Sequence, residues 1–234
     1  MDDFTQAAAL AGQLVLSLDP DLVEIVLLSL RVSLGATAIA CAVGLPLGAA
    51  LAVSRFPGRG AVIVTFGALM GLPPVVVGLV VYLMLSRAGP LGFLGLLYTP
   101  TAMVAAQTVL ILPIVAALGR QVLESLHQEY AELFASLSLS RRRQVWTLLR
   151  DGRLALTTVA LAGFGRAVAE VGAVMIVGGN IDHLTRVMTT AIALEASRGE
   201  LALALALGLV LIVLALLVNA AAHGARLRGM RELA

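Results

Sequence analysis

Charge is scarce in this 234-residue chain: charged residues make up 13% of it and hydrophobic residues 60%. A soluble domain carries about a quarter charged residues, so a water-facing surface is hard to build here. Lysine is absent, and all 16 basic residues are arginines. A Walker-type phosphate loop needs a lysine, so this chain holds no such ATP site. The single cysteine, Cys41, excludes an intrachain disulfide, and we expect it to be a buried, unreactive side chain.

Apolar segments of twenty or so residues, nearly free of charge, recur along the chain. Each is long enough to cross a hydrocarbon core about 30 Å thick. They predict an all-α, polytopic membrane protein with five transmembrane helices. The spans are expected at about 22–54, 61–86, 101–118, 154–177 and 201–222.

Three segments of different character make up the predicted organisation. Residues 1–20 form an N-terminal interfacial segment, because the apolar run over 4–18 is too short to span. Residues 21–225 form the transmembrane domain, which includes a polar cytoplasmic loop over 120–153. Residues 226–234 form a cytoplasmic tail.

The positions of the arginines predict how the chain crosses the membrane. Eleven of them fall in segments that five spans would place on one face, whereas the segment before the first span carries aspartates and no base. The positive-inside rule then puts the amino terminus outside and the carboxyl terminus in the cytoplasm. We expect a multi-pass protein of a bacterial or archaeal cytoplasmic membrane. The eleven are Arg55, Arg59, Arg120, Arg141, Arg142, Arg143, Arg150, Arg153, Arg226, Arg228 and Arg231.

Two prolines interrupt the second predicted span. Pro73 and Pro74 remove two amide donors from a helix, which is tolerated at membrane depth only beside protein or a cavity. They are therefore candidates for lining a translocation pathway, and a simple packing kink explains them equally well.

Two ionisable residues lie within the fourth predicted span. Arg166 and Glu170 are four residues apart, which places them on one face of a continuous helix. Unpaired charge inside a membrane is costly, so such residues usually face a bundle interior or a water-filled path. The pair either gates an anion pathway or fixes helix packing as a structural ion pair, and both interpretations predict burial and pairing.

The loop over 120–153 is predicted to form two short amphipathic helices joined near 138–140. A helix of this kind can dock into a groove of a soluble partner. Alternatively, its arginines anchor the loop at the lipid headgroups.

Part of this loop resembles the EAA loop of ABC importer permeases, whose pattern is Glu-Ala-Ala, three residues and then Gly. Glu132 matches the Glu, Leu133 and Phe134 stand where the family has alanines, and Ser138 stands at the Gly. The Leu-Pro that follows later in the family pattern is missing. The resemblance implies a coupling helix that inserts into an ATP-binding subunit, with Arg141 beside it.

Further segments resemble the permease subunit of tungstate ABC importers, within the molybdate, tungstate and sulfate permease superfamily. They are 71–78, 89–92, 98–101, 163–180, 185–190 and 194–199. The resemblance implies a type I ABC importer permease fold and a non-catalytic subunit that acts as a homodimer. Two ATP-binding cassette subunits and an extracytoplasmic oxyanion-binding protein are the implied partners, and tungstate the implied cargo.

Several alternatives stay open at this point. Molybdate or sulfate could replace tungstate as cargo, and a secondary transporter or channel would need no ATPase. Such a transporter would carry charge in several spans or an internal repeat. We expect no cofactor, no nucleic-acid partner and no metal site, because the three histidines are widely spaced.

Overall fold

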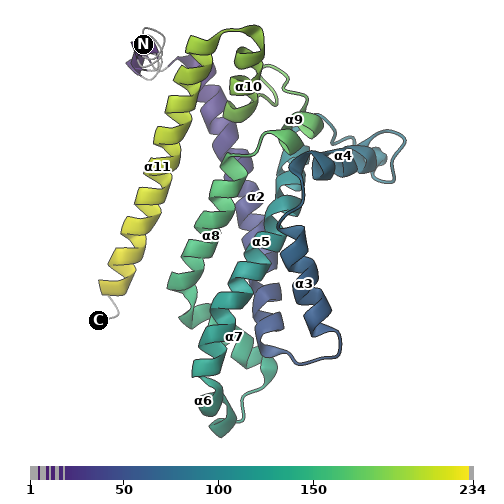
Figure 1. Ribbon diagram of the computed structural model, residues 1–234, viewed down its shortest axis with the longest axis vertical. Helices are drawn as coiled ribbons and strands as arrows, with labels where there is room; N and C mark the ends of the chain where they lie inside the picture. Colours follow the sequence, from purple (N-terminus) through teal and green to yellow (C-terminus); the bar gives the residue numbers. More distant parts are fainter. Residues whose placement is uncertain (1–4, 6–8, 11, 14–15, 18, 232–234) are drawn as a thin grey trace. The chain divides into compact units, whose positions relative to one another are not determined.

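The computed structural model describes residues 5, 9–10, 12–13, 16–17 and 19–231, and across these residues every regular element is a helix. The all-α prediction is therefore confirmed, whereas the predicted interfacial segment lies largely outside the described residues. The elements in chain order (Figure 1) are α2 (Pro20–Val53), α3 (Arg59–Leu69), α4 (Pro74–Leu85), η1 (Gly92–Leu94), α5 (Pro100–Glu129), α6 (Ala131–Ser136), α7 (Arg141–Asp151), α8 (Arg153–Val168), α9 (Gly172–Gly178), α10 (Met188–Arg198) and α11 (Leu201–Arg231).

Three of the described helices, α2, α5 and α11, are each long and apolar enough to cross a membrane. Two bent pairs, α3 with α4 and α8 with α9, raise the number of candidate spans to five if each pair is one span. The five predicted spans correspond to these five candidates. The helix at the third span is longer than expected, because α5 continues to Glu129.

The helices contribute to two compact units that interleave along the sequence. Unit 1 comprises residues 1–36, 73–107 and 165–220. Unit 2 comprises residues 37–72, 108–164 and 221–234. The helices α2, α5, α8 and α11 each supply residues to both units, so neither unit is a contiguous stretch of chain.

Within unit 1, the start of α2 packs against α10 and α11 through Leu22, Met188 and Leu207, all of which are buried. The start of α2 follows its sequence signals. Asp19 Oδ1 accepts hydrogen bonds from the amides of Asp21 and Leu22 at 3.1 and 3.0 Å, so it satisfies donors that the first helical turn leaves free.

Within unit 2, small residues bring α2, α5 and α8 into close contact. A Cβ atom added at Gly48 of α2 would lie 2.6 Å from the carbonyl oxygen of Ala116 in α5. A Cβ atom added at Gly163 of α8 would lie 3.0 Å from the Ile111 side chain. Backbones that approach this closely are typical of helix pairs in membranes.

The second predicted span is divided at the double proline. Helix α3 ends at Leu69 and α4 begins at Pro74. Pro73 has extended backbone angles and Pro74 occupies the first turn of α4, where a missing amide donor costs little. The sequence-based prediction of a break here is confirmed.

The prediction of one continuous helix over 154–177 is wrong. Helix α8 ends at Val168 and α9 begins at Gly172, and the pair is bent by 58°. Glu170 therefore lies in the break and not on the helical face that carries Arg166. Cys41 also differs from expectation, because it is only partly buried.

Candidate functional site

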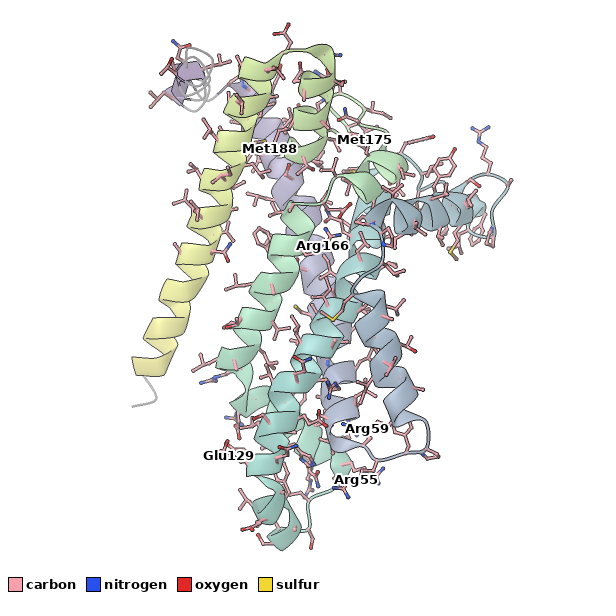
Figure 2. All side chains as sticks on the ribbon, in the orientation of Figure 1. Arg55, Arg59, Glu129, Arg166, Met175 and Met188 are labelled. Carbon is pink, nitrogen blue, oxygen red and sulfur yellow. The ribbon has the colours of Figure 1, made fainter. Side chains whose placement is uncertain are left out.

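An ion pair crosses the break between α8 and α9. Arg166 Nη1 donates to Glu170 Oε2 at 2.6 Å, and Figure 2 shows Arg166 near the C-terminal end of α8. The Glu170 side chain is 3% exposed, whereas that of Arg166 is 34% exposed. The expected pairing of these two residues is confirmed, although the helix does not continue between them.

Further contacts fix Glu170 in place. Its second carboxylate oxygen, Oε1, accepts a hydrogen bond from the Ala173 amide at 3.0 Å, near the start of α9. The Thr189 hydroxyl donates to the Glu170 carbonyl oxygen at 2.8 Å. Both carboxylate oxygens and the backbone of Glu170 thus have partners within unit 1.

The two members of the pair differ in what they can do. Glu170 is enclosed, so a buried carboxylate without Arg166 would cost about 3–5 kcal/mol. The Arg166 guanidinium has five N–H donors in a planar fork that matches the oxygens of an anion. Because a third of the side chain is open, Arg166 can present donors to an oxyanion while Glu170 stays bound to α9.

Gln107 of α5 and Thr189 of α10 belong to this polar cluster, and sequence reasoning missed both. Gln107 Nε2 donates to the Ala167 carbonyl oxygen at 3.0 Å, and its Oε1 is buried with no hydrogen-bond partner in the described structure. The available signal was a lone amide inside an apolar span. Thr189 gave no such signal, because threonine is common in helices of every kind.

Helix α4, which begins at Pro74, packs against α9 beside this cluster. Val75 follows Pro74 directly, and a Cβ atom added at Gly172 would lie 2.8 Å from Val75 Cγ2. A Cβ atom added at Gly78 would lie 2.8 Å from the Ala173 Cα atom, so α4 packs tightly on α9. The break at Pro73 and Pro74 thereby starts the helix that covers the Glu170 cluster.

The segment 178–187 after α9 is held by side chains. Thr185 is fully buried, accepts from the Ile181 amide at 2.9 Å and donates to the Gly178 carbonyl oxygen at 2.6 Å. His183 Nδ1 lies 2.9 Å from Glu24 Oε2 of α2. The hydrogen bond to Glu24, together with the negative charge of Asp182, raises the pKa of the His183 imidazole above its ordinary value.

In unit 2, the loop over 120–153 forms two short helices, α6 and α7, as the sequence predicts. Among its predicted coupling residues, Phe134 does not face outward. It is 3% exposed and packs against His127 and Tyr130, with ring centroids 5.8 and 5.7 Å apart. Phe134 therefore attaches α6 to the end of α5 and cannot itself contact another protein.

The exposed side of α6 is mostly apolar and carries one acid. Glu132 is exposed, and Leu133 and Leu137 are 52% and 59% exposed. The two leucines are four residues apart, so they lie on the same face. Arg141, at the start of α7, is also exposed.

Ser138 ends α6 in a left-handed conformation, with φ of 48°. The Leu139 amide donates to the Phe134 carbonyl oxygen at 3.1 Å, and the Ser138 amide donates to that of Ala135 at 3.1 Å. These two bonds form a Schellman motif, whose left-handed position favours glycine. The geometry explains why a glycine would suit the position that Ser138 occupies.

An ion-pair cluster at the base of this loop was not predicted. Arg59 Nη2 donates to Glu124 Oε1 at 2.6 Å, and Arg120 pairs with the other oxygen of the same carboxylate. Arg59 Nε also donates to the Leu51 carbonyl oxygen at 2.8 Å. The cluster joins the end of α2, the start of α3 (Figure 2) and α5. Across the part of the chain that the structure describes, no three His, Cys, Asp or Glu side chains gather as a metal site.

Comparison with known proteins gives one matching family and several relatives. The sequence model of the binding-protein-dependent transport system inner membrane component matches residues 44–224. The chain is 40% identical over 223 residues to the tungstate uptake system permease protein TupB of Peptoclostridium acidaminophilum, covering 95% of this chain and 98% of that protein. It is 42% identical over 212 residues to a probable anion ABC transporter permease protein of Haloferax volcanii, covering 88% and 90%. It is 28% identical over 173 residues to the molybdenum transport system permease protein ModB of Azotobacter vinelandii, covering 70% and 76%.

Proposed function

Because the chain belongs to the family of binding-protein-dependent transport system inner membrane components, we propose that its cargo is an oxyanion, tungstate above all. The chain is the non-catalytic membrane subunit of an ABC importer. The observation that supports tungstate as the cargo is the 40% identity to a tungstate uptake permease, which covers 95% of this chain and 98% of that relative. Family membership argues against a secondary transporter or channel that works without an ATPase.

An ATPase subunit and a binding protein are the partners that the family implies. We propose the finer assembly of two copies of this chain, two ATP-binding subunits and one extracytoplasmic oxyanion-binding protein. Two copies are needed because five spans enclose too little space for a pathway. The arginine distribution supports an amino terminus outside and a carboxyl terminus in the cytoplasm. In this scheme 21–225 is the transmembrane domain, 120–153 its cytoplasmic loop and 226–234 a cytoplasmic tail.

Helix α6 is the proposed contact with the ATPase. Glu132 and Leu133 are exposed on it, which suits docking of a short helix into a partner's groove. Phe134 and Ser138 act indirectly, since Phe134 anchors the helix to α5 and Ser138 turns the chain towards α7. Arg141 lies at the edge of the proposed contact.

Arg166 and Glu170 are the proposed gate of the anion pathway. When the spans move, the partly open guanidinium of Arg166 can exchange the carboxylate of Glu170 for an oxyanion of the same charge sign. Glu170 remains held by the Ala173 amide during this exchange. Pro73 and Pro74 divide the span that packs over α9, so α4 can shift without unwinding a continuous helix.

Reconstitution of the complete transporter tests the cargo. ATP hydrolysis in proteoliposomes is measured with the binding protein empty, or loaded with tungstate, molybdate or sulfate. We expect the largest stimulation and uptake with tungstate. Molybdate is the second candidate, because a molybdenum transport permease is a relative at 28% identity. Equal or greater uptake of molybdate at matched binding-protein occupancy would overturn tungstate as the main cargo.

A further inference from the structure

A basic pocket of about 770 Å³ lies beside α7 in unit 2. Its lining includes Arg142, Arg143, Trp146 and Leu149 of α7 and Pro46 of α2. No acidic residue lines it. The pocket is therefore positively charged at one side and apolar at the other.

The arginines of this pocket are not used within the protein. Arg142 and Arg143 are exposed, and neither forms an ion pair with any described residue. Arg59 and Arg120 of the same unit are instead paired with Glu124. The positive charge at α7 is thus available to an external anionic group.

An apolar groove continues from this pocket. A second hollow of about 370 Å³ shares Pro46 and Leu149 with the first, so the two adjoin. Its other walls come from α2 and α8, including Leu45, Cys41 and Leu156, with Arg153 as its one charged residue. Both helices belong to candidate membrane spans, so a groove between their apolar side chains suits an acyl chain.

Trp146 marks the boundary between the two environments. It is the single tryptophan of the chain, and this large aromatic residue is 73% exposed. Tryptophan prefers the membrane interface, where its ring contacts acyl chains and its N–H reaches the headgroup region. An exposed indole here suits a helix that lies along the bilayer surface.

We propose that this composite site binds one anionic phospholipid, with its phosphate on Arg142 and Arg143 and an acyl chain along the groove between α2 and α8. The charge selects an anionic headgroup, and the apolar groove selects a lipid over a free anion. The loop over 120–153 then serves both partner docking and lipid anchoring, each through a different helix. Helix α6 meets the ATPase, and α7 holds the lipid.

The sole tryptophan makes the site directly observable. The full-length chain is placed in phosphatidylcholine nanodiscs that contain a small fraction of acyl-brominated lipid, whose bromine quenches Trp146 on contact. Two arginines near an anionic surface favour it by roughly 30-fold together, so brominated phosphatidylglycerol should quench at a correspondingly lower mole fraction than brominated phosphatidylcholine. Equal quenching by the two lipids would overturn the proposal.

Matched variants separate this site from general charge effects. Arg142→Gln with Arg143→Gln should abolish the preference for phosphatidylglycerol, whereas Arg142→Lys with Arg143→Lys should retain most of it. Arg55→Gln with Arg150→Gln removes the same charge from exposed residues outside the pocket and should leave the preference unchanged. Loss of the preference in this control pair, or its survival in the double glutamine variant, would contradict the site.

Two further measurements test the occupant. Inorganic phosphate and tungstate are added to the nanodiscs, and displacement of the brominated lipid by either would indicate a free-oxyanion site and overturn a lipid site. Native mass spectrometry of the complex with the ATPase should still detect phosphatidylglycerol retained by the wild type and lost from the double glutamine variant. Loss of this lipid on ATPase binding would instead assign the pocket to the protein interface.

Discussion

Arg166 donates to the Glu170 carboxylate at 2.6 Å across a break in the chain, with Glu170 enclosed and Arg166 a third exposed. A purely structural ion pair and a gate make the same contact, so the structure must be perturbed to separate them. The Ala173 amide is a second partner of the Glu170 carboxylate. Substitutions that remove the charge of Arg166 alone, or the charges of Arg166 and Glu170 together, distinguish the two roles.

Arg166→Gln should lower both stability and transport. Removing one partner of a buried pair costs about 3–5 kcal/mol, which thermal unfolding of the purified complex measures. Arg166→Gln with Glu170→Gln should recover most of that stability, since no buried charge remains without a partner. If Arg166 meets the oxyanion, tungstate uptake stays at least about tenfold below wild type in the double variant, as expected for a lost charge-assisted contact.

The control for this pair is the ion pair of Arg198 and Glu195 in α10, at 3.2 Å with Arg198 57% exposed. Arg198→Gln should lower stability much less than Arg166→Gln and leave uptake unchanged, because the Arg198 guanidinium is mostly open to water and the Glu195 side chain, at 13% exposed, is less enclosed than that of Glu170. Recovery of full transport in the Arg166 and Glu170 double variant would show that the pair only fixes packing.

Gly48→Ala tests the close contact of α2 with α5. The added Cβ atom would meet the Ala116 carbonyl oxygen at 2.6 Å and the Arg120 amide at 2.9 Å, both of them backbone atoms that cannot turn aside. Forcing the helices apart should destabilise the protein by about 1–3 kcal/mol, measured as a lower midpoint of thermal unfolding.

Gly67→Ala of α3 is the matched control for Gly48→Ala. Nothing lies within 4 Å of the Cβ position at Gly67, so this substitution should be neutral or stabilising by up to about 1 kcal/mol. Equal destabilisation by the two substitutions would mean that helix flexibility, and not contact, explains the glycine at 48.

Ser138→Gly should stabilise the α6 turn. A left-handed residue with a side chain costs roughly 1–2 kcal/mol, partly offset by the greater freedom of glycine in the unfolded chain, so a net gain of up to about 1 kcal/mol is expected. Ser138→Val should destabilise, because a branched side chain is least tolerated at positive φ. Ser140→Gly, at an extended position two residues on, should bring no gain in the unfolding midpoint.

The contact of His183 with Glu24 predicts a pH dependence. The pKa of His183 is raised, first by the hydrogen bond to Glu24 and then by the charge of Asp182. Since the folded pKa exceeds the unfolded one, the contact adds stability below about pH 6.5 and loses it as the pH rises through the raised value. Histidine NMR should find that Glu24→Gln lowers this pKa, while Glu195→Gln leaves it unchanged. An unaltered His183 titration in Glu24→Gln would contradict the assigned cause.

The spans and the loop helices could be predicted because local chemistry determines them. Long uncharged runs define α2, α5 and α11, and Asp19 with Pro20 specifies where α2 begins. A single proline was no reliable sign of a break. Pro46 and Pro113 both lie inside helices, whereas the pair at Pro73 and Pro74 removes two donors and ends one.

The break between α8 and α9 could not be predicted, because it depends on contacts distant in sequence. No proline lies there, and the spacing of Arg166 and Glu170 fits a continuous helix. At the break, the Thr189 hydroxyl donates to the Glu170 carbonyl oxygen and Val75 packs against Gly172. Neither contact can be predicted from the residues around 169–171 alone. The burial of Phe134 was missed for the same reason, since its partners His127 and Tyr130 lie on α5 and at its end.

Glu132→Lys tests the assignment of α6 to the ATPase. Glu132 is exposed next to Leu133, and it forms no ion pair with any described residue, so the substitution should leave the isolated permease stable. Reversing a charge at a docking surface costs several kcal/mol, so co-purification of the ATPase should fall at least about tenfold. Glu129→Lys, exposed at the end of α5, should retain the ATPase. Phe134→Ala should differ from both, because the loss of a buried aromatic ring lowers the stability of the isolated permease by about 3–5 kcal/mol. Retention of the ATPase by Glu132→Lys would remove α6 from the interface.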